Sequence, residues 1–343
     1  MRIFHSNDHR GHAGAKEMRY DQLIPMCESP DRMDTILAAV KDQGHRDIVE
    51  AERFEIAPIL RVHTPGFVDF LERCWPLWEA EFGPGGFATA YMFGMRGMDQ
   101  VPNASVHSML SCYTFDVCVP FVAGTWTAIR SAVDVTLSAA AHVAAGNAAA
   151  FALCRPPGHH ASADLAGGYC YVNNAAVAAQ RLLDGGASRI AILDVDYHHG
   201  NGTQSIFYER SDVLYASIHA TPEREYPFLM GYARETGRGE GEGFNFNQPL
   251  PLGTRLDGYR PALAAALQRV RTHAPEVLIV SLGVDTFARD PVGGFALETP
   301  DYKTIGAAIA TLNLPTLFVM EGGYAIAELG VNTANVITGF AGG

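Results

Sequence analysis

The sequence predicts a single α/β domain of the doubly wound type, in which helices flank a central, mainly parallel sheet. The main observation is that short apolar strands alternate with helices of ten or more residues from residue 125 onward, the pattern of consecutive βαβ units. A second observation is that the 343 residues contain no linker-like stretch and no internal repeat. We therefore expect residues 1–343 to form one domain.

The individual elements follow from apolar runs and from their Gly and Pro boundaries. We predict strands at 2–5, 149–154, 190–193, 213–218, 277–282 and 316–320, and helices at 33–42, 66–80, 125–145, 174–184, 258–273 and 302–311. The strand at 190–193 is apolar at every position. Strands of this kind are typically buried on both faces of a parallel sheet.

Residues 81–120 break this regular alternation. The segment is rich in Gly, Met and aromatic residues and has no clean hydrophobic period. A loop this long inside a compact domain usually has a function, and this one is too apolar to be a disordered linker. We expect it to form a lid or a contact surface.

Composition excludes several classes of protein. With 48% hydrophobic and 18% charged residues, the chain can bury a sizeable core and is not globally disordered. The formal net charge of -12 argues against non-specific binding to nucleic acid, which needs a basic surface. The six cysteines form no Cys-x-x-Cys pair, so we expect reduced thiols. No signal-peptide pattern and no membrane span is evident, so we expect a cytoplasmic protein without a membrane partner.

The most informative stretch follows the strand at 190–193. It places Asp194, Asp196, His198 and His199 within six positions. An unpaired buried charge is too unfavourable to keep, and a metal cation is one partner that would compensate it. Asp196 and His198 are two residues apart, so on an extended segment they point to the same side and can share one ion. For an isolated Asp-x-His, a polar loop with salt-bridged aspartates would be the commoner interpretation.

Three other predicted strands also end in reactive residues. These are the pair His159 and His160, then Asp285, and finally Tyr324. Ligands of open parallel sheets bind beyond the carboxyl ends of the strands, so the fold would gather these side chains at one edge. Histidines are natural proton carriers, and Gly322–Gly323 would let the backbone turn the Tyr324 phenol inward to stabilise an oxyanion.

Together these residues predict a hydrolytic metal site. Two carboxylates and one imidazole leave coordination positions open for water and substrate, which is the mark of a catalytic zinc. Other chemistries lack support. Ser162, Ser205 and Ser217 do not lie in a Gly-x-Ser-x-Gly elbow, and the glycine-rich run at 237–243 lacks the lysine of a phosphate-binding loop.

Five motifs carry a resemblance to a known family. They are Cys-Arg-Pro-Pro-Gly-His-His ending at His160, Gly-Gly-Tyr-Cys ending at Cys170, Leu-Asp-Val-Asp-Tyr-His-His-Gly-Asn-Gly-Thr-Gln ending at Gln204, Ser-Leu-Gly-Val-Asp ending at Asp285, and Met-Glu-Gly-Gly-Tyr ending at Tyr324. The chain resembles the zinc-dependent deacetylases of the arginase–histone deacetylase superfamily, and most of all the bacterial acetylpolyamine amidohydrolases. The resemblance covers nearly the whole chain and implies the arginase/deacetylase fold, with a sheet of about eight strands.

The resemblance implies a role for each strand-end residue. Zinc would be bound by Asp196, His198 and Asp285. His160 would act as general base and then as general acid, while His159, the partner of Asp194, would contribute mainly electrostatically. Tyr324 would hydrogen-bond the substrate carbonyl oxygen and then the tetrahedral intermediate.

Two further features come from the same resemblance. Asn201 stands where many histone deacetylases carry an aspartate beside the second histidine, and a neutral partner should leave that imidazole less basic. A structural potassium ion would lie next to the zinc, with Asp194, Ser217 and the carbonyl of Ile218 among its ligands.

The resemblance also describes the substrate gorge. Tyr169 would line it and Tyr226 would lie near its mouth, with Glu17 and Tyr20 as further substrate-binding residues. Segment 81–120 would form the homodimer contact and narrow the gorge. Some relatives carry glutamates in this segment to meet the distal ammonium of the substrate.

This chain departs from those relatives at the corresponding positions. They are His107 and Cys118, which are not acidic. Glu17, Asp99 and Asp116 are the remaining candidates, and the preferred chain length of the substrate stays open.

The expected function is zinc-dependent hydrolysis of N-acetylated polyamines or diamines, such as acetylputrescine and acetylcadaverine, to acetate and the free amine. A protein deacetylase acting on acetyl-lysine is the main alternative, since it uses the same chemistry with different access. A non-catalytic binding module would require a lost catalytic residue, and none is missing. An arginase-like ureohydrolase would need two metals, and His159 and Tyr324 argue against it.

Overall fold

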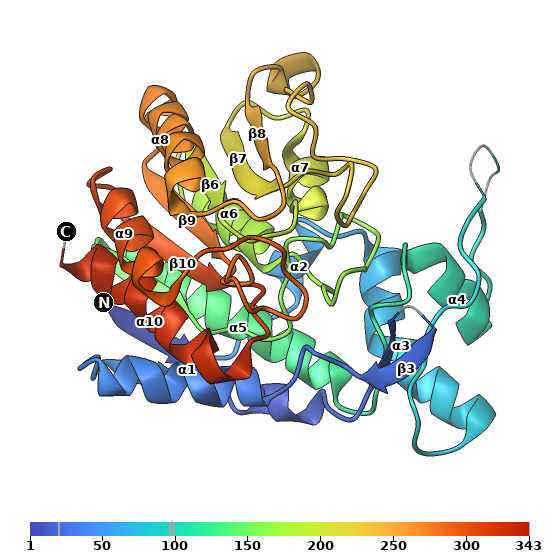
Figure 1. Cartoon of the computed structure of the whole chain (residues 1–343). Coiled ribbons are helices and arrows are strands. Elements are labelled where there is room, and N and C mark those ends of the chain that lie inside the picture. The colour runs from blue at the N-terminus through green and yellow to red at the C-terminus, as the bar shows by residue number, and fades with distance from the viewer. Residues whose placement is uncertain (20, 96–97, 99, 343) are drawn as a thin grey trace.

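The computed structural model describes residues 1–19, 21–95, 98 and 100–342. Its centre is an eight-stranded sheet with the strand order β4-β1-β5-β10-β9-β6-β7-β8, in which all neighbours are parallel (Figure 1). The strands are β1 (Arg2–His5), β4 (Ile48–Glu50), β5 (Ala149–Ala152), β6 (Ile190–Asp194), β7 (Val213–Ala220), β8 (Asn245–Leu250), β9 (Val277–Leu282) and β10 (Thr316–Met320). The predicted α/β class and parallel sheet are confirmed.

Helices cover both faces of the sheet. They are α1 (Asp31–Asp42), α2 (Ala57–Leu60), α3 (Pro65–Phe82), α4 (Val106–Tyr113), α5 (Thr125–Ala144), α6 (Asn174–Asp184), α7 (Asn201–Phe207), α8 (Leu256–His273), α9 (Thr299–Ala310) and α10 (Ile326–Ala341). Helices α1, α10, α9 and α8 follow one another on one face, and α5 packs against α6 on the other (Figure 1). None of the described helices is long and apolar enough to cross a membrane.

Helix α5 packs closely on the sheet because many of its residues are alanines. Its residues Ala128, Ala132, Ala139 and Ala140 are buried. Small side chains favour the helix and let it lie close to the sheet. The helix was predicted from this alanine-rich composition, and it contacts β1, β5 and β10.

Several elements differ from the prediction. The edge strands β4 and β8, the helix α10 and an antiparallel hairpin of β2 (Lys16–Arg19) and β3 (Gln22–Pro25) were not predicted. Strand β8 is half-buried and interrupts its apolar residues with Asn245, Asn247 and Gln248, because it lies at the end of the sheet and needs no continuous apolar run.

Segment 81–120 is not wholly irregular, since it contains α4. Helices α3 and α4 share a second hydrophobic cluster, separate from the main core, that includes Phe67, Phe70, Leu110 and Phe121. The segment extends away from the central sheet (Figure 1). Its residues Tyr91, Met92, Met95, Met98 and Val101 are strongly exposed.

Candidate active site

The two carboxylates and the imidazole of the predicted metal site lie together. Strands β6 and β9 are parallel neighbours, so the residues that follow them meet at the same edge of the sheet. The possible ligand atoms of Asp196, His198 and Asp285 all lie within 4.8 Å of one another, and all three residues are buried. Nδ1 of His198 is 3.1 Å from Asp285 Oδ2 and 3.4 Å from Asp196 Oδ1.

Two glycines make room for these carboxylates. A Cβ atom at Gly283 would lie 2.0 Å from Asp196 Oδ2, and one at Gly322 would lie 2.4 Å from Asp285 Oδ2. The Gly322 N–H also donates to Asp196 Oδ2 over 2.7 Å. Any larger residue at either position would displace a carboxylate from the site.

The chemistry of this donor set fits a divalent metal ion. Burial disfavours a charged imidazole, yet hydrogen bonds and charge from Asp196 and Asp285 raise the pKa of His198 to about 10. Burial and the neighbouring charge of Asp196 raise the pKa of Asp285 to about 7. The cluster therefore retains protons at neutral pH. A divalent cation that displaced those protons would compensate the negative charge of the same carboxylates. Three protein ligands leave coordination positions open, as in catalytic metal sites.

The two adjacent histidines have different hydrogen-bond partners. His159 Nδ1 lies 3.0 Å from Asp194 Oδ2, which also accepts the Tyr215 hydroxyl. His160 Nδ1 lies 2.7 Å from Asn201 Oδ1. Since an oxygen faces each Nδ1, each Nδ1 carries a hydrogen and each Nε2 is left for other partners.

The charge states of the two imidazoles differ accordingly. Burial opposes the charged form of both rings. The carboxylates of Asp196 and Asp194 nevertheless raise the pKa of His159 to about 10. Burial, together with the positive charges of His159 and His198, holds the pKa of His160 well below its ordinary value. A cationic His159 thus stands beside a neutral His160, with ring centroids 4.0 Å apart.

The backbone of the histidine pair is fixed by a buried carboxylate. Glu321, which directly follows β10, accepts the N–H of Gly158 over 2.7 Å and that of His159 over 3.1 Å through Oε2. Its Oε1 accepts the Ser281 hydroxyl. Three neighbouring strands, β5, β9 and β10, are thereby connected just below the site.

Tyr324 lies at the same edge of the sheet. Its ring packs against Tyr169, with centroids 5.5 Å apart, and against the Arg32 guanidinium at 4.8 Å. In the described part of the chain no residue hydrogen-bonds to the Tyr324 hydroxyl. The phenol is therefore available to a ligand.

Two more tyrosines approach the site, and a carboxylate holds each of them. The Tyr169 hydroxyl donates to Glu17 Oε2 over 2.5 Å, and the Tyr226 hydroxyl donates to Asp116 Oδ2 over 2.6 Å. The Tyr226 ring centroid is 5.0 Å from that of His160. The structure thus brings Glu17, Tyr169 and Tyr226 to the site, whereas Tyr20 and Asp99 lie outside the described residues.

The residues predicted to bind potassium are also close together. Asp194 and Ser217 are paired in the register of β6 and β7, and Ile218 follows. All three are buried. The Ser217 hydroxyl is 2.7 Å from His219 Nδ1.

Sequence reasoning missed a buried charge network that supports the site. Glu28 Oε1 accepts hydrogen bonds from Arg32 over 2.8 Å and from Arg155 over 2.7 Å. Arg32 also donates to the carbonyl oxygens of Gly323 and Glu321, just before Tyr324. Glu28 and Arg32 are four residues apart, but Arg155 and Gly323 are distant in sequence and no motif connects them, so only the folded structure reveals the network.

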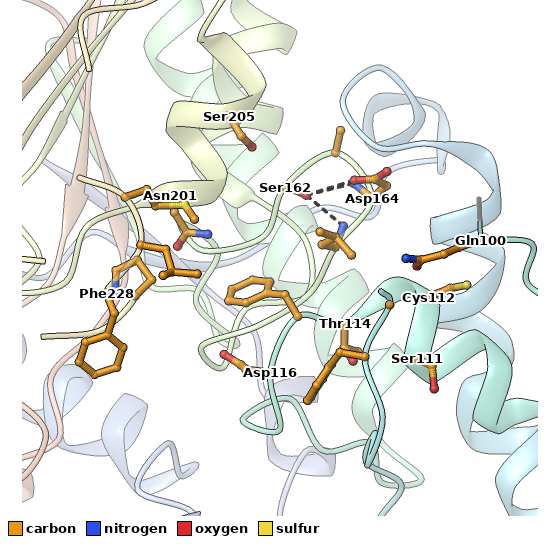
Figure 2. Close-up of a pocket in the computed structure, with 18 of the residues that line it drawn as sticks. Gln100, Ser111, Cys112, Thr114, Asp116, Ser162, Asp164, Asn201, Ser205 and Phe228 are labelled. Carbon is orange, nitrogen blue, oxygen red and sulfur yellow. Dashed lines mark hydrogen bonds between the residues drawn. The ribbon is translucent and has the colours of Figure 1, made fainter. Parts of the chain in front are cut away.

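A surface cavity of about 910 Å³ is lined by Tyr226 and Asn201, both of which contact His160. Figure 2 shows Asn201 and Phe228 at one end of the cavity and Asp164 and Gln100 at the other. Its lining includes Asp116 and Asp164, and its described lining residues include no Lys, Arg or His. The cavity therefore suits a ligand with an apolar and a cationic part.

Comparisons with known proteins agree with this geometry. Residues 26–340 match the family described as histone deacetylase domain. The chain is 49% identical to acetylpolyamine amidohydrolase 1 of Pseudomonas aeruginosa, over 100% of this chain and 99% of that protein. It is 46% identical to the acetylpolyamine amidohydrolase of Mycoplana ramosa, over 100% of both.

Solved structures give the same result. The crystal structure of acetylpolyamine aminohydrolase from Burkholderia pseudomallei superimposes with a TM-score of 0.93 and 38% identity, covering 99% of this chain and 98% of that chain. The HDA15 HD domain gives a TM-score of 0.83 at 27% identity, covering 100% and 91%. The chain belongs to the histone deacetylase domain family.

Proposed function

We propose that the protein is a zinc-dependent amidohydrolase that removes acetyl groups from N-acetylated polyamines and diamines, releasing acetate and the free amine. One observation carries the proposal. The buried Asp196, His198 and Asp285 lie beside His159 and His160, at the sheet edge where Tyr324 has a hydroxyl without a partner among the described residues. The full-length relatives named acetylpolyamine amidohydrolase support the substrate class.

Zinc is the metal that this donor set favours. Two carboxylates and one imidazole are common protein ligands of catalytic zinc, and the buried position excludes competing solvent. When bound, zinc would lower the pKa of a water molecule and polarise the amide carbonyl. The remaining chemistry belongs to the protein's own side chains.

His160 moves the proton in this proposal. Its Nδ1 is occupied by Asn201, so Nε2 accepts a proton from the attacking water and delivers it to the nitrogen of the leaving amine. The low pKa of His160 keeps it neutral and ready to act as a base. The atoms balance, because one water and one amide become acetate and an amine.

His159 and Tyr324 stabilise the charge that develops on the acyl oxygen. Tyr324 donates its free hydroxyl to that oxygen. His159 holds its positive charge nearby because Asp194 fixes its ring and accepts its Nδ1 hydrogen.

The gorge is proposed to run between Tyr169 and Tyr226, whose phenols Glu17 and Asp116 hold in place. Aromatic faces on both sides suit a slender alkyl chain, and cation–π attraction favours an ammonium group. The acidic cavity beside Tyr226 adds to this preference, because its described lining contains carboxylates and no cationic side chain.

Two accessory features are proposed as well. A potassium ion is held by Asp194, Ser217 and the Ile218 carbonyl, so potassium should raise the melting temperature more than an equal concentration of choline. Segment 81–120 forms a homodimer contact, because its exposed aromatic and Met side chains make an apolar surface. Sedimentation should show a dimer that Tyr91→Glu weakens.

The substrate assignment is tested by comparing kcat/KM for acetylcadaverine, acetylputrescine and an acetyl-lysine peptide. A narrow gorge predicts efficient turnover of the small amines and poor turnover of the peptide. The reverse order would mean that segment 81–120 leaves the site open and that the enzyme is a protein deacetylase.

A further inference from the structure

A carboxylate outside the predicted catalytic set is directly attached to the backbone of Tyr324. Asp290 lies five residues after Asp285, is 8% exposed, and accepts four backbone hydrogen bonds. Its Oδ2 accepts the N–H of Tyr324 over 2.7 Å and that of Ala325 over 3.0 Å. Its Oδ1 accepts the N–H of Val292 over 2.9 Å and that of Gly293 over 3.3 Å.

The backbone at Tyr324 needs such an attachment. Gly322 and Gly323 precede it, and Gly323 has a φ of 131°, a conformation that other residues rarely adopt. Helix α10 begins only at Ile326. Because the Tyr324 hydroxyl has no partner among the described residues, the direction of the phenol depends on ring packing and on the backbone.

The same carboxylate is connected to the predicted metal ligand Asp285. Oδ1 of Asp290 closes the turn that contains Gly293, and a Cβ atom at Gly293 would lie 1.8 Å from the carbonyl oxygen of Asp285. The turn therefore packs directly on the backbone of Asp285. One side chain thus sets the spacing between the loop of the metal ligand and the loop of the phenol.

We propose that Asp290 is a positioning residue, whose carboxylate fixes the backbone of Tyr324 so that the hydroxyl meets the acyl oxygen of a substrate held near Asp285. The proposal rests on the proposed hydrolysis of acetylated amines. A shift of the phenol by less than 1 Å weakens the hydrogen bond to the developing oxyanion more than it weakens substrate binding.

The test is a double-mutant cycle of Asp290→Asn with Tyr324→Phe, measured as kcat and KM for acetylcadaverine and referred to the zinc-loaded fraction. Asparagine has one acceptor oxygen in place of two, so the hydrogen bonds from one pair of backbone N–H groups are lost. We expect kcat to fall by about 10- to 100-fold with little change in KM. In the Tyr324→Phe background the same substitution should lower kcat by less than about twofold, because the hydroxyl that Asp290 positions is gone.

Equal losses in both backgrounds would overturn the proposal, as would an unchanged kcat in Asp290→Asn. Asp301→Asn is the matched control, because its carboxylate also accepts a backbone N–H, that of Glu298, but on α9 away from the site. This control should leave kcat unchanged. If Asp290→Asn does not fold, Asp290→Glu keeps the charge, displaces the carboxylate by one methylene and goes through the same cycle.

Hydrogen exchange gives a readout that does not depend on activity. In metal-free protein, the amides of residues 324 and 325 should exchange faster in Asp290→Asn than in the wild type, and Asp301→Asn should leave them unchanged. Unchanged amide exchange in Asp290→Asn would contradict the role of Asp290 in holding the backbone of Tyr324. An inactive wild type with the expected exchange would instead refute the proposed function and leave only the backbone attachment standing.

Discussion

Nδ1 of His160 lies 2.7 Å from the side-chain oxygen of Asn201. The partner is an uncharged amide, so the bond fixes the ring without adding negative charge. Since burial and the positive charge of His159 hold the pKa of His160 well below its ordinary value, the ring stays neutral. The proposed general base is therefore in its active form over a wide pH range.

Asn201→Asp should narrow that range. A carboxylate at this position favours the imidazolium and raises the pKa of His160. Because the base must be neutral, the acidic limb of the kcat/KM profile should move to higher pH, while the zinc content stays the same. The pH dependence of kcat/KM for acetylcadaverine measures the shift, and an unmoved acidic limb would exclude His160 as the base.

Tyr324→Phe should remove the donor to the acyl oxygen. The ring can keep its packing against Tyr169 and Arg32, so folding and zinc binding should persist. We expect kcat to fall by about 100- to 1000-fold, as for the loss of an oxyanion-hole donor. Steady-state kinetics checks this, with Tyr208→Phe as the control because Tyr208 is a half-buried tyrosine at the end of α7. A change confined to KM would be inconsistent with the assigned role.

Glu17→Ala should loosen the gorge wall. It removes the acceptor of the Tyr169 hydroxyl, a hydrogen bond to a charged group worth about 1.5 kcal/mol or more. We expect KM for acetylcadaverine to rise by about tenfold, with a smaller change in kcat. Lys16→Ala, at an exposed neighbour on the same strand, should behave as the wild type. Equal KM values for the two variants would argue against this role.

Stability should decrease in mild acid. Burial lowers the pKa of His12 and of His63 to about 4, while both groups titrate near 6.5 in the unfolded chain. Below pH 6.5 the unfolded state therefore binds more protons, and the free energy of unfolding falls until pH 4. Above pH 6.5 this stability is fully present. Each histidine contributes a slope of up to about 1.4 kcal/mol per pH unit.

His63→Gln should reduce the slope of unfolding free energy against pH by the contribution of one histidine. Glutamine cannot titrate, and its side-chain oxygen can still accept the Asn173 N–H that His63 Nε2 accepts. Urea unfolding of metal-stripped protein at several pH values from 4 to 6.5 measures the slope. Metal removal matters, because metal release also takes up protons. A variant with the wild-type slope would contradict the buried neutral state of His63.

The sequence was sufficient to predict the parallel sheet and the residues at its carboxyl edge. Strands β6, β9 and β10 are mostly apolar and fully buried, and the reactive side chains of Asp196, Asp285 and Tyr324 follow shortly after their ends. Parallel topology brings the ends of such strands together whatever their distance in the chain, so their meeting could be expected.

Other features could not be predicted, because they depend on contacts between distant segments. Strand β8 has no continuous apolar run and forms because its backbone pairs with β7. The carboxylate of Asp290 receives N–H groups from a loop 34 residues away, and Glu28 meets Arg155 across 127 residues. Local periodicity carries no information about pairings of this kind.

The central claim is that Asp196, His198 and Asp285 hold the metal on which hydrolysis depends. The most direct measurement is the rate of amine release from acetylcadaverine by native, metal-stripped and zinc-restored protein, with bound metal determined in each sample. We predict that stripping abolishes turnover, that one zinc ion per chain restores it, and that Asp285→Asn neither retains zinc nor recovers. Undiminished turnover in the stripped protein, or full activity of Asp285→Asn, would contradict the account.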